Sequence, residues 1–377
     1  MAVAVLMRVA PADPRHAGVH RVGSRLFCAL ACTLLVWSTA ACSSSGGGHA
    51  HAHQVSASDT RCALHGPLLD GADPSVAFLD GRYYLVQSDG QRSITVTRAS
   101  SIAGLGRATP VTVWTAPTGT GASAETWAPE IEHIEGHWYI YFAAATDFGG
   151  DPETNDTHRL FVLSADGDDP LGSWTFEGRL QPHVDEWAID PSVFRHGNRL
   201  WLLWSGTPHG NGGDPPQQIF LARMSGPLRA TGPAIRLATP DRPWERSVQA
   251  IEEGPEPWVG PGGTLTIVYN ANASWTRHYA LGALVHRSGP LITASSYQKR
   301  GPVLSSANGL YGPGGESLPV RGPGGRLWTL FHAKTTKADG WDDRKIFAQP
   351  VSWASDGTPR FVLLARDDED QKGRTCP

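Results

Sequence analysis

Acidic side chains recur at one place in a repeating sequence pattern, and their spacing suggests the chemistry they could perform. Each stands in a short segment with a proline, shortly ahead of a turn that contains glycine; the five are Asp73, Glu130, Asp190, Glu253 and Glu316. If these segments are equivalent parts of one fold, the carboxylates meet in a common cavity. Carboxylates that face one another repel, which separates their pKa values and leaves one as an acid and another as a base.

Such an acid and base, held roughly 6.5–9.5 Å apart so that a water fits between them, hydrolyse glycosidic bonds with inversion. The alternative is that these pairs of an acid and a proline are purely structural and merely begin strands, where a proline costs no hydrogen bond of the sheet. Aromatic side chains lie beside the same segments, namely Trp127, Trp204 and Trp275. For each tryptophan, stacking on a sugar ring and packing in the core are equally compatible with the sequence.

The elements that would position these acids are β-hairpins. An apolar strand, a turn with glycine and a second aromatic or aliphatic strand recur five times, at residues 76–86, 131–141, 193–203, 257–268 and 318–330. Asp-Gly, Glu-Gly and Gly-Gly turns between such strands are typical of hairpins. Five similar all-β units predict a five-bladed β-propeller, whose radial repetition protects the sheet edges. We expect one such catalytic domain over residues 62–377.

Composition excludes one class of partner. The 377 residues carry a formal net charge of −4, so a basic surface for nucleic acid has no support. No oligomerisation surface is visible, and we expect a monomer whose partner is an oligo- or polysaccharide.

The first residues read as an export signal. Basic residues precede an apolar run at 26–37, which is too short for a membrane span but typical of a signal peptide. Small residues then lead into Cys42, so we expect a lipoprotein signal over 1–41 and a lipid anchor on Cys42. An ordinary secretory signal is the alternative. A flexible Gly/Ser/His tether over 42–61 would follow, placing the protein outside the cell or in its envelope, with membrane contact only through the lipid.

Two cysteines remain in the predicted mature domain. Cys62 and Cys376 stand at opposite ends of the predicted globular region. In an oxidising compartment they predict a disulfide that joins the ends of the closed ring, with two free thiols as the alternative.

Taken together, the motifs resemble glycoside hydrolase family 43, a family of five-bladed propellers. The resemblance runs from Ala72 to about Leu364, and its best segments are Ala72–Val76, Trp127–Glu130, His158–Leu163, Trp187–Asp190 and Glu253–Pro255. Stretches at 138–144, 204–206 and 311–314 are most similar to the α-L-arabinofuranosidases of the family.

The resemblance implies a role for individual residues. Asp73 matches the general base, Asp190 the aspartate that tunes the acid and orients the substrate, and Glu253 the general acid. Glu252 is adjacent, but successive strand residues face opposite ways, so only one of the pair should point into the cavity. Further positions are expected to bind substrate, each with a structural alternative: Trp127, His158, Trp204 and Arg344.

One segment departs from the family pattern. Gly315 and Glu316 stand where the family usually has a His-Asn pair, whose histidine commonly helps to hold a central ion. A structural Ca²⁺ on the propeller axis is therefore doubtful, and we predict no metal ligands and no required cofactor, since an acid, a base and water suffice.

The resemblance implies an inverting glycoside hydrolase that releases L-arabinofuranose from arabinan- or arabinoxylan-type glycans. A β-xylosidase or an endo-arabinanase of the same family is one alternative. A catalytically inactive glycan-binding propeller is another, because the fifth segment is altered.

Overall fold

The computed structural model describes residues 66–150, 153–180 and 185–361. All of them belong to one compact unit, residues 55–377. Within this described part, no helix has the length and apolar character needed to cross a membrane. The predicted signal, the tether and the residues Cys42, Cys62 and Cys376 lie outside the described residues, so those predictions remain predictions.

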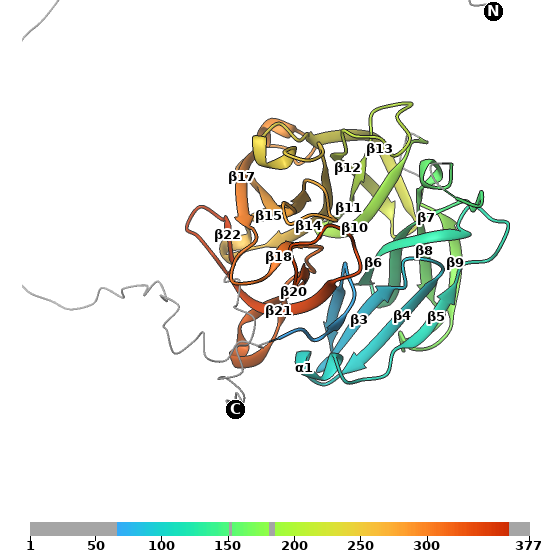
Figure 1. Cartoon of the computed structure of the whole chain (residues 1–377). Coiled ribbons are helices and arrows are strands. Elements are labelled where there is room, and N and C mark those ends of the chain that lie inside the picture. The colour runs from blue at the N-terminus through green and yellow to red at the C-terminus, as the bar shows by residue number, and fades with distance from the viewer. Residues whose placement is uncertain (1–65, 151–152, 181–184, 362–377) are drawn as a thin grey trace, which may run out of the picture. The chain divides into compact units, whose positions relative to one another are not determined.

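Five antiparallel sheets are arranged around a central axis as the blades of a propeller, which confirms the predicted fold (Figure 1). Four blades have four strands each, in the order of the chain. The first two blades consist of β2 (Ser75–Leu79), β3 (Arg82–Ser88), β4 (Ser93–Ala99) and β5 (Val111–Thr115), and of β6 (Ala124–Ile134), β7 (His137–Ala145), β8 (Arg159–Ala165) and β9 (Trp174–Arg179). The next two consist of β10 (Ala188–His196), β11 (Arg199–Gly206), β12 (Gln218–Gly226) and β13 (Arg229–Ala238), and of β14 (Glu252–Val259), β15 (Leu265–Ala271), β16 (Ala280–His286) and β17 (Tyr297–Leu304).

The fifth blade closes the ring with strands from both ends of the described chain. Its centre is β20 (Leu327–Lys334) and β21 (Arg344–Trp353), and β18 (Tyr311–Gly314) and β19 (Val320–Arg321) pair with β20. On the side away from β20, β21 pairs with β1 (Leu69–Asp70), where Leu69 lies opposite Ile346, and with β22 (Pro359–Phe361). Because the first and last strands share one blade, the ring is held shut by backbone hydrogen bonds.

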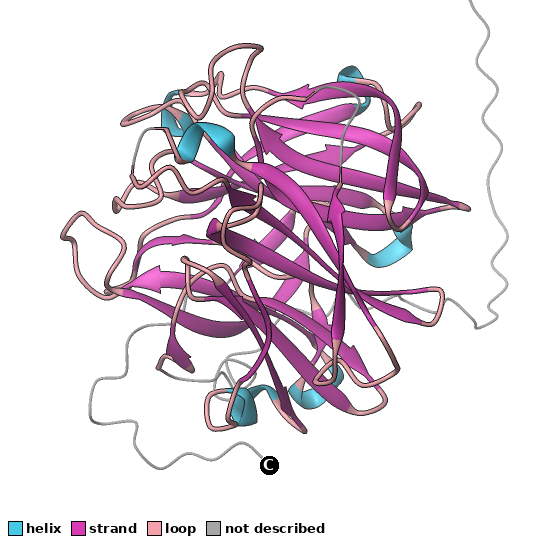
Figure 2. Cartoon of the chain, turned by 90° about the vertical axis from the view of Figure 1, so that its right-hand side faces the viewer, coloured by secondary structure: helices cyan, strands magenta, loops and turns pink. Residues whose placement is uncertain are grey.

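Helices are few and short in the described chain (Figure 2). One α-helix, α1 (Ile102–Leu105), begins at Ser101, whose side chain accepts a hydrogen bond from the Gly104 N–H. The rest are 3-10 turns: η2 (Asn155–Thr157), η3 (Pro243–Glu245), η4 (Pro261–Gly263), η5 (Ala294–Ser296) and η6 (Pro323–Gly325).

The five predicted hairpins are all present, between the first two strands of the first four blades and between β19 and β20 in the fifth. In the first, Leu79 pairs with Arg82 across Asp80 and Gly81, whose φ angles are 49° and 73°. A two-residue turn with both φ values positive matches the twist of the flanking strands, and this is why glycine is needed there. The turn glycines Gly136, Gly197, Gly262 and Gly324 also have positive φ.

Neighbouring blades pack face to face because strand side chains alternate. On β7, Ile140 and Phe142 belong to the apolar cluster shared with the first blade, whereas Tyr141 belongs to the cluster shared with the third. Both faces of β7 are therefore buried between neighbouring blades.

Candidate active site

The inner segment of every blade contains a residue in the left-handed region at one equivalent position. The φ values of these five residues lie between 41° and 56°, and the residues are Asp73, Ala128, Asp190, Gly254 and Gly315. Two inner segments contain a second left-handed residue, Glu125 and Gly312. Non-glycine residues rarely adopt this conformation, and where they do it is often at a functional site. The repeated left-handed residue gives the five blades a common structural register.

Relative to this left-handed residue the five acids are not equivalent, so the expectation that they occupy the same position at the start of five equivalent strands is wrong. Asp73 and Asp190 occupy the left-handed position itself, whereas Glu253 precedes it, and Glu316 and Glu130 follow it by one and two residues. A shift along a strand changes both the depth and the direction of a side chain. The acids therefore lie at different depths along the propeller axis, and we call the two depths the upper and the second level.

Asp73, Asp190 and Glu253 form the upper level. The Gly254 N–H donates a hydrogen bond of 2.9 Å to Asp190 Oδ2, which ties the third blade to the strand that carries Glu253. Burial raises the pKa of Asp190 well above its ordinary value, and the nearby charges of Glu253 and Asp73 raise it further. The negative charges of Asp73 and Glu253 thus oppose the ionisation of Asp190.

Asp73 is held as a carboxylate. His332 Nδ1 lies 3.2 Å from Asp73 Oδ1, and Arg344 Nη1 lies 3.7 Å from Asp73 Oδ2. Burial by itself would raise the pKa of Asp73, but the hydrogen bond and charge of His332, together with the charge of Arg344, bring it down to about 2. Since 37% of the side chain is exposed, water can reach this anion.

Glu253 has the opposite character. Burial, followed by the charge of Asp73, raises the pKa of Glu253 to about 7, although Tyr279 and Arg344 lower it in part. The Tyr279 hydroxyl donates a hydrogen bond of 2.7 Å to Glu253 Oε1. Glu253 can therefore carry a proton near neutral pH, at which Asp73 is ionised.

Two residues that the sequence did not single out connect this acid and this base. The Tyr279 ring stacks on the His332 ring, with planes at 8° and centroids 5.8 Å apart. His332 is fully buried and contacts Asp73, while Tyr279 contacts Glu253. We call this pair the Tyr279–His332 bridge. A histidine inside the apolar run of β20 was the signal that could have pointed to it.

The Tyr279–His332 bridge accounts for the glycine at position 315 in the fifth blade. A Cβ atom on Gly315 would lie 2.3 Å from Asp73 Oδ1 and 2.6 Å from His332 Nδ1. The volume that a side chain at 315 would fill is thus taken by the imidazole of His332, which arrives from β20. Glycine at this position is required by the contact between base and histidine.

The metal prediction concerns the surroundings of Gly315 and Glu316. No group of three or more His, Cys, Asp or Glu side chains among them is arranged to bind a metal ion, and the volume beside Gly315 is filled. That the reaction needs no cofactor stays a prediction.

The deeper acids form a second level. Glu130 and Glu256 are both buried, and Ser192 Oγ lies 3.4 Å from Glu256 Oε2. Burial raises the pKa of Glu130 to about 8 and the pKa of Glu256 well above its ordinary value. A pKa of about 8 leaves Glu130 largely protonated near neutral pH, and both carboxyls lie two residues beyond the left-handed position of their strands.

Strand alternation separates the adjacent pair Glu252 and Glu253. Glu252 is fully buried away from the upper level, with Oε1 2.5 Å from Lys299 Nζ. Lys299 also lies 3.1 Å from the buried Glu245. Glu253 is thus the member of the pair that faces Asp73.

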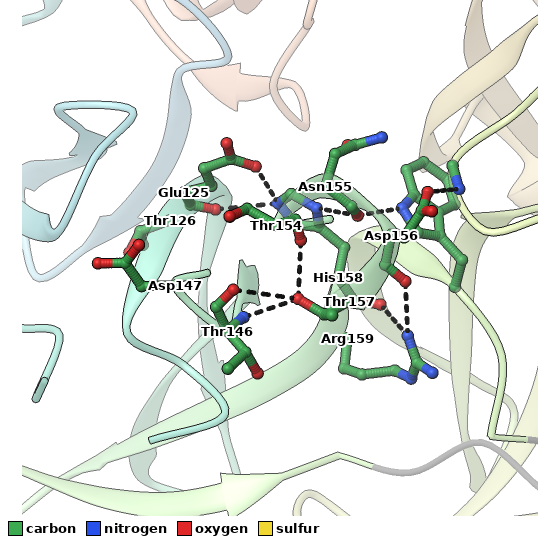
Figure 3. Close-up of polar contacts among 12 residues, drawn as sticks. Glu125, Thr126, Thr146, Asp147, Thr154, Asn155, Asp156, Thr157, His158 and Arg159 are labelled. Carbon is green, nitrogen blue, oxygen red and sulfur yellow. Dashed lines mark hydrogen bonds and ion pairs between the residues drawn. The ribbon is translucent and has the colours of Figure 1, made fainter. Parts of the chain in front are cut away.

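Two of the residues expected to bind substrate belong to the interior instead. Trp204 is 4% exposed and stacks on Phe220 between the second and third blades, so its structural alternative holds. His158 has no exposed surface; its ring nitrogens contact the carbonyl oxygens of Asn155 and Glu125 (Figure 3). Trp204 is covered by packing between the second and third blades, whereas the His158 ring is covered by Trp127 of its own blade and by the edge of Trp187.

The other two are accessible. The half-buried Trp127 stacks on His158 with ring centroids 3.9 Å apart, so the buried histidine supports the tryptophan from behind. Arg344, at the start of β21, is 22% exposed and contacts Asp73. Both therefore remain candidates for substrate contact.

Comparisons with known proteins agree with this geometry. The family model described as glycosyl hydrolases family 43 matches residues 67–359. An extracellular exo-α-(1→5)-L-arabinofuranosidase of Streptomyces avermitilis is 31% identical over 84% of this chain and 66% of its own length. The α-L-arabinofuranosidase 43 of Humicola insolens is 29% identical over 80% and 63%. The chain thus spans slightly less than two thirds of the length of these two relatives.

A solved structure covers the propeller more fully. The crystal structure of an α-L-arabinofuranosidase from Lactobacillus brevis aligns with a TM-score of 0.74 and 29% identity, over 81% of this chain and 98% of that one. A xylan β-1,4-xylosidase from Bacillus halodurans aligns with a TM-score of 0.62 at 18% identity, which supports the fold alone.

Proposed function

Since the chain belongs to glycosyl hydrolases family 43, we propose that it is an inverting α-L-arabinofuranosidase that releases L-arabinofuranose from arabinan- or arabinoxylan-type glycans. The relatives named for α-(1→5) linkages favour arabinan. One observation carries the mechanism: two facing carboxyls whose pKa values are pushed apart, Asp73 to about 2 and Glu253 to about 7.

In the proposed reaction Asp73 is the general base and Glu253 the general acid. Asp73 takes a proton from a water molecule as the water oxygen bonds to the anomeric carbon. Glu253 gives its proton to the glycosidic oxygen as the bond to that carbon breaks. The water attacks from the side opposite to the leaving group, so the anomeric configuration inverts.

Asp190 acts as a positioning residue in this proposal. It accepts the hydrogen bond of the Gly254 N–H, which fixes the residue next to Glu253. Burial and the charges of its neighbours raise the pKa of Asp190 well above its ordinary value and so favour its protonated form, in which Asp190 would donate a hydrogen bond to a sugar hydroxyl.

The test measures initial rates on aryl α-L-arabinofuranoside and aryl β-D-xyloside. We expect arabinoside turnover, and a loss of about 100- to 10,000-fold in kcat for Asp73→Ala and for Glu253→Ala, the range of a general acid or base. Asp70→Ala, at an acid that is 86% exposed on β1, is the matched control and should behave as the wild type.

Other results would change the assignment. A preference for the xyloside would move it to a β-xylosidase. Turnover of polymeric arabinan without turnover of either aryl glycoside would indicate an endo-arabinanase, and binding without turnover an inactive propeller. Retention of the anomer in an NMR time course would contradict the two-carboxyl water mechanism.

We further propose that the protein is exported as a monomer and anchored by a lipid on Cys42. The two Streptomyces relatives bear the word extracellular in their names, and the sequence before Cys42 is typical of a lipoprotein signal. Mass spectrometry of the mature N-terminus tests the anchor, with Cys42→Ser as the control that should release the protein from membranes.

A further inference from the structure

Two tryptophans on neighbouring loops form an aromatic pair that the chemistry above does not use. Trp275 lies between β15 and β16, and Trp341 lies between β20 and β21. Their rings meet edge to face, with centroids 5.4 Å apart and planes at 64°. Trp341 is 53% exposed and is the only tryptophan among the exposed large apolar residues of the described chain. We call Trp275 and Trp341 the tryptophan pair.

The pair is held in place by polar contacts. Trp341 Nε1 donates to Ser274 Oγ at 3.2 Å, so the exposed ring has a fixed direction. The Trp275 carbonyl accepts from the Gly340 N–H and from Lys334 Nζ, both at 2.8 Å. A ring whose orientation is already fixed loses little conformational freedom when a ligand stacks on it.

The loops that carry the pair lead directly to the two reacting carboxyls. The loop of Trp275 ends at Tyr279, whose hydroxyl contacts Glu253. The loop of Trp341 is followed by Arg344, whose Nε donates to the Trp341 carbonyl at 3.3 Å while its Nη1 contacts Asp73. The tryptophan pair is therefore tied to the acid on one side and to the base on the other.

We infer that the tryptophan pair is a binding subsite for the sugar on the leaving-group side of the scissile bond. This inference rests on the proposed function, because Glu253 must protonate the oxygen that joins this sugar. The apolar C–H face of a pentose stacks on an indole ring, and its hydroxyls need polar neighbours. Arg277 and His278, both exposed on the loop of Trp275, supply such donors at the rim.

The subsite implies that a glycan of several sugars is bound more tightly than free arabinose. Titration calorimetry on the Glu253→Gln protein measures binding without turnover, with α-(1→5)-linked arabinotriose and with arabinose as ligands. Adding Trp341→Ala should weaken arabinotriose binding about tenfold and should change arabinose binding less than twofold. Trp341→Phe, which keeps an aromatic face, should restore most of the affinity.

Phe78→Ala provides the matched control, since Phe78 is 40% exposed at the hairpin end of β2, away from Asp73; it should not alter binding. Equal arabinotriose affinity with and without Trp341, equal losses for both ligands, or no binding of arabinotriose at all would overturn the subsite. The proposed function is judged separately by wild-type turnover of the aryl arabinoside. A wild type that binds arabinotriose through Trp341 but turns over no arabinoside would keep the subsite and refute the function.

Discussion

Replacing Gly315 with alanine perturbs the base without changing any polar group. The added Cβ would lie 2.3 Å from Asp73 Oδ1 and 2.6 Å from His332 Nδ1. Ordinary contacts begin near 3.4 Å, so the carboxylate or the imidazole must move by about 1 Å, and a misplacement of about 1 Å can cost about 100-fold in rate. We therefore expect kcat/KM for aryl α-L-arabinofuranoside to fall about 100-fold in Gly315→Ala.

A second cost of this change concerns the backbone rather than the site. Gly315 has a φ of 56°, and a residue with a Cβ pays roughly 1–2 kcal/mol in the left-handed region. Gly325→Ala isolates this term, because Gly325 has a φ of 70° in the same blade and nothing within 4 Å of its added Cβ. Both variants should lose similar free energy of unfolding in urea, but only Gly315→Ala should lose activity.

The comparison between the two glycines can refute the reasoning. If the folded Gly315→Ala protein keeps kcat/KM within about twofold of Gly325→Ala, then Asp73 and His332 do not need the volume beside Gly315. A loss of activity in both variants to the same degree would assign the effect to backbone strain. The acid limb of the pH profile adds a second readout, since separating His332 from Asp73 should raise the pKa of the base and move that limb to higher pH.

Three further predictions follow from the charges of the described residues. The value of kcat/KM should fall as the pH rises through about 7, because Glu253 must be protonated. On the acid side it should stay constant until the pH approaches the pKa of Asp73, about 2, because Asp73 must be ionised. A profile that is flat from pH 5 to 9 would contradict this prediction. Tyr279→Phe removes a hydrogen bond that lowers the pKa of Glu253, so the alkaline limb of the same profile should move to higher pH, and a downward move would refute the role of the hydroxyl. Lys299→Met leaves two fully buried carboxyls without their cation and should cost about 3–5 kcal/mol of unfolding free energy in urea. Lys345→Met, which breaks an exposed ion pair, should cost less than about 1 kcal/mol. Equal losses in the two variants would contradict the difference in burial.

Local sequence determined the architecture. Each hairpin depends on contacts between residues a few positions apart, such as Leu79 with Arg82 across Asp80 and Gly81, so turn glycines and alternating apolar residues were sufficient to predict it. The repetition of the hairpin then predicted the number of blades. The same alternation separated Glu253 from Glu252 before the structure placed them on opposite sides.

Tertiary structure decided the details of the site, because these depend on residues far apart in the chain. Asp73 and His332 are 259 positions apart, and nothing near either residue in the sequence indicates their contact. The left-handed register of the inner segments placed Asp73 and Asp190 above Glu130, a difference in depth that a shared acid–proline pattern hides. Likewise Trp204 is covered by a neighbouring blade, whereas Trp341 projects from a loop into water. The local pattern of the chain thus determined the blades and the supply of acids at the axis, whereas only the packing of blade against blade decided which of those acids are charged and which aromatic rings are exposed.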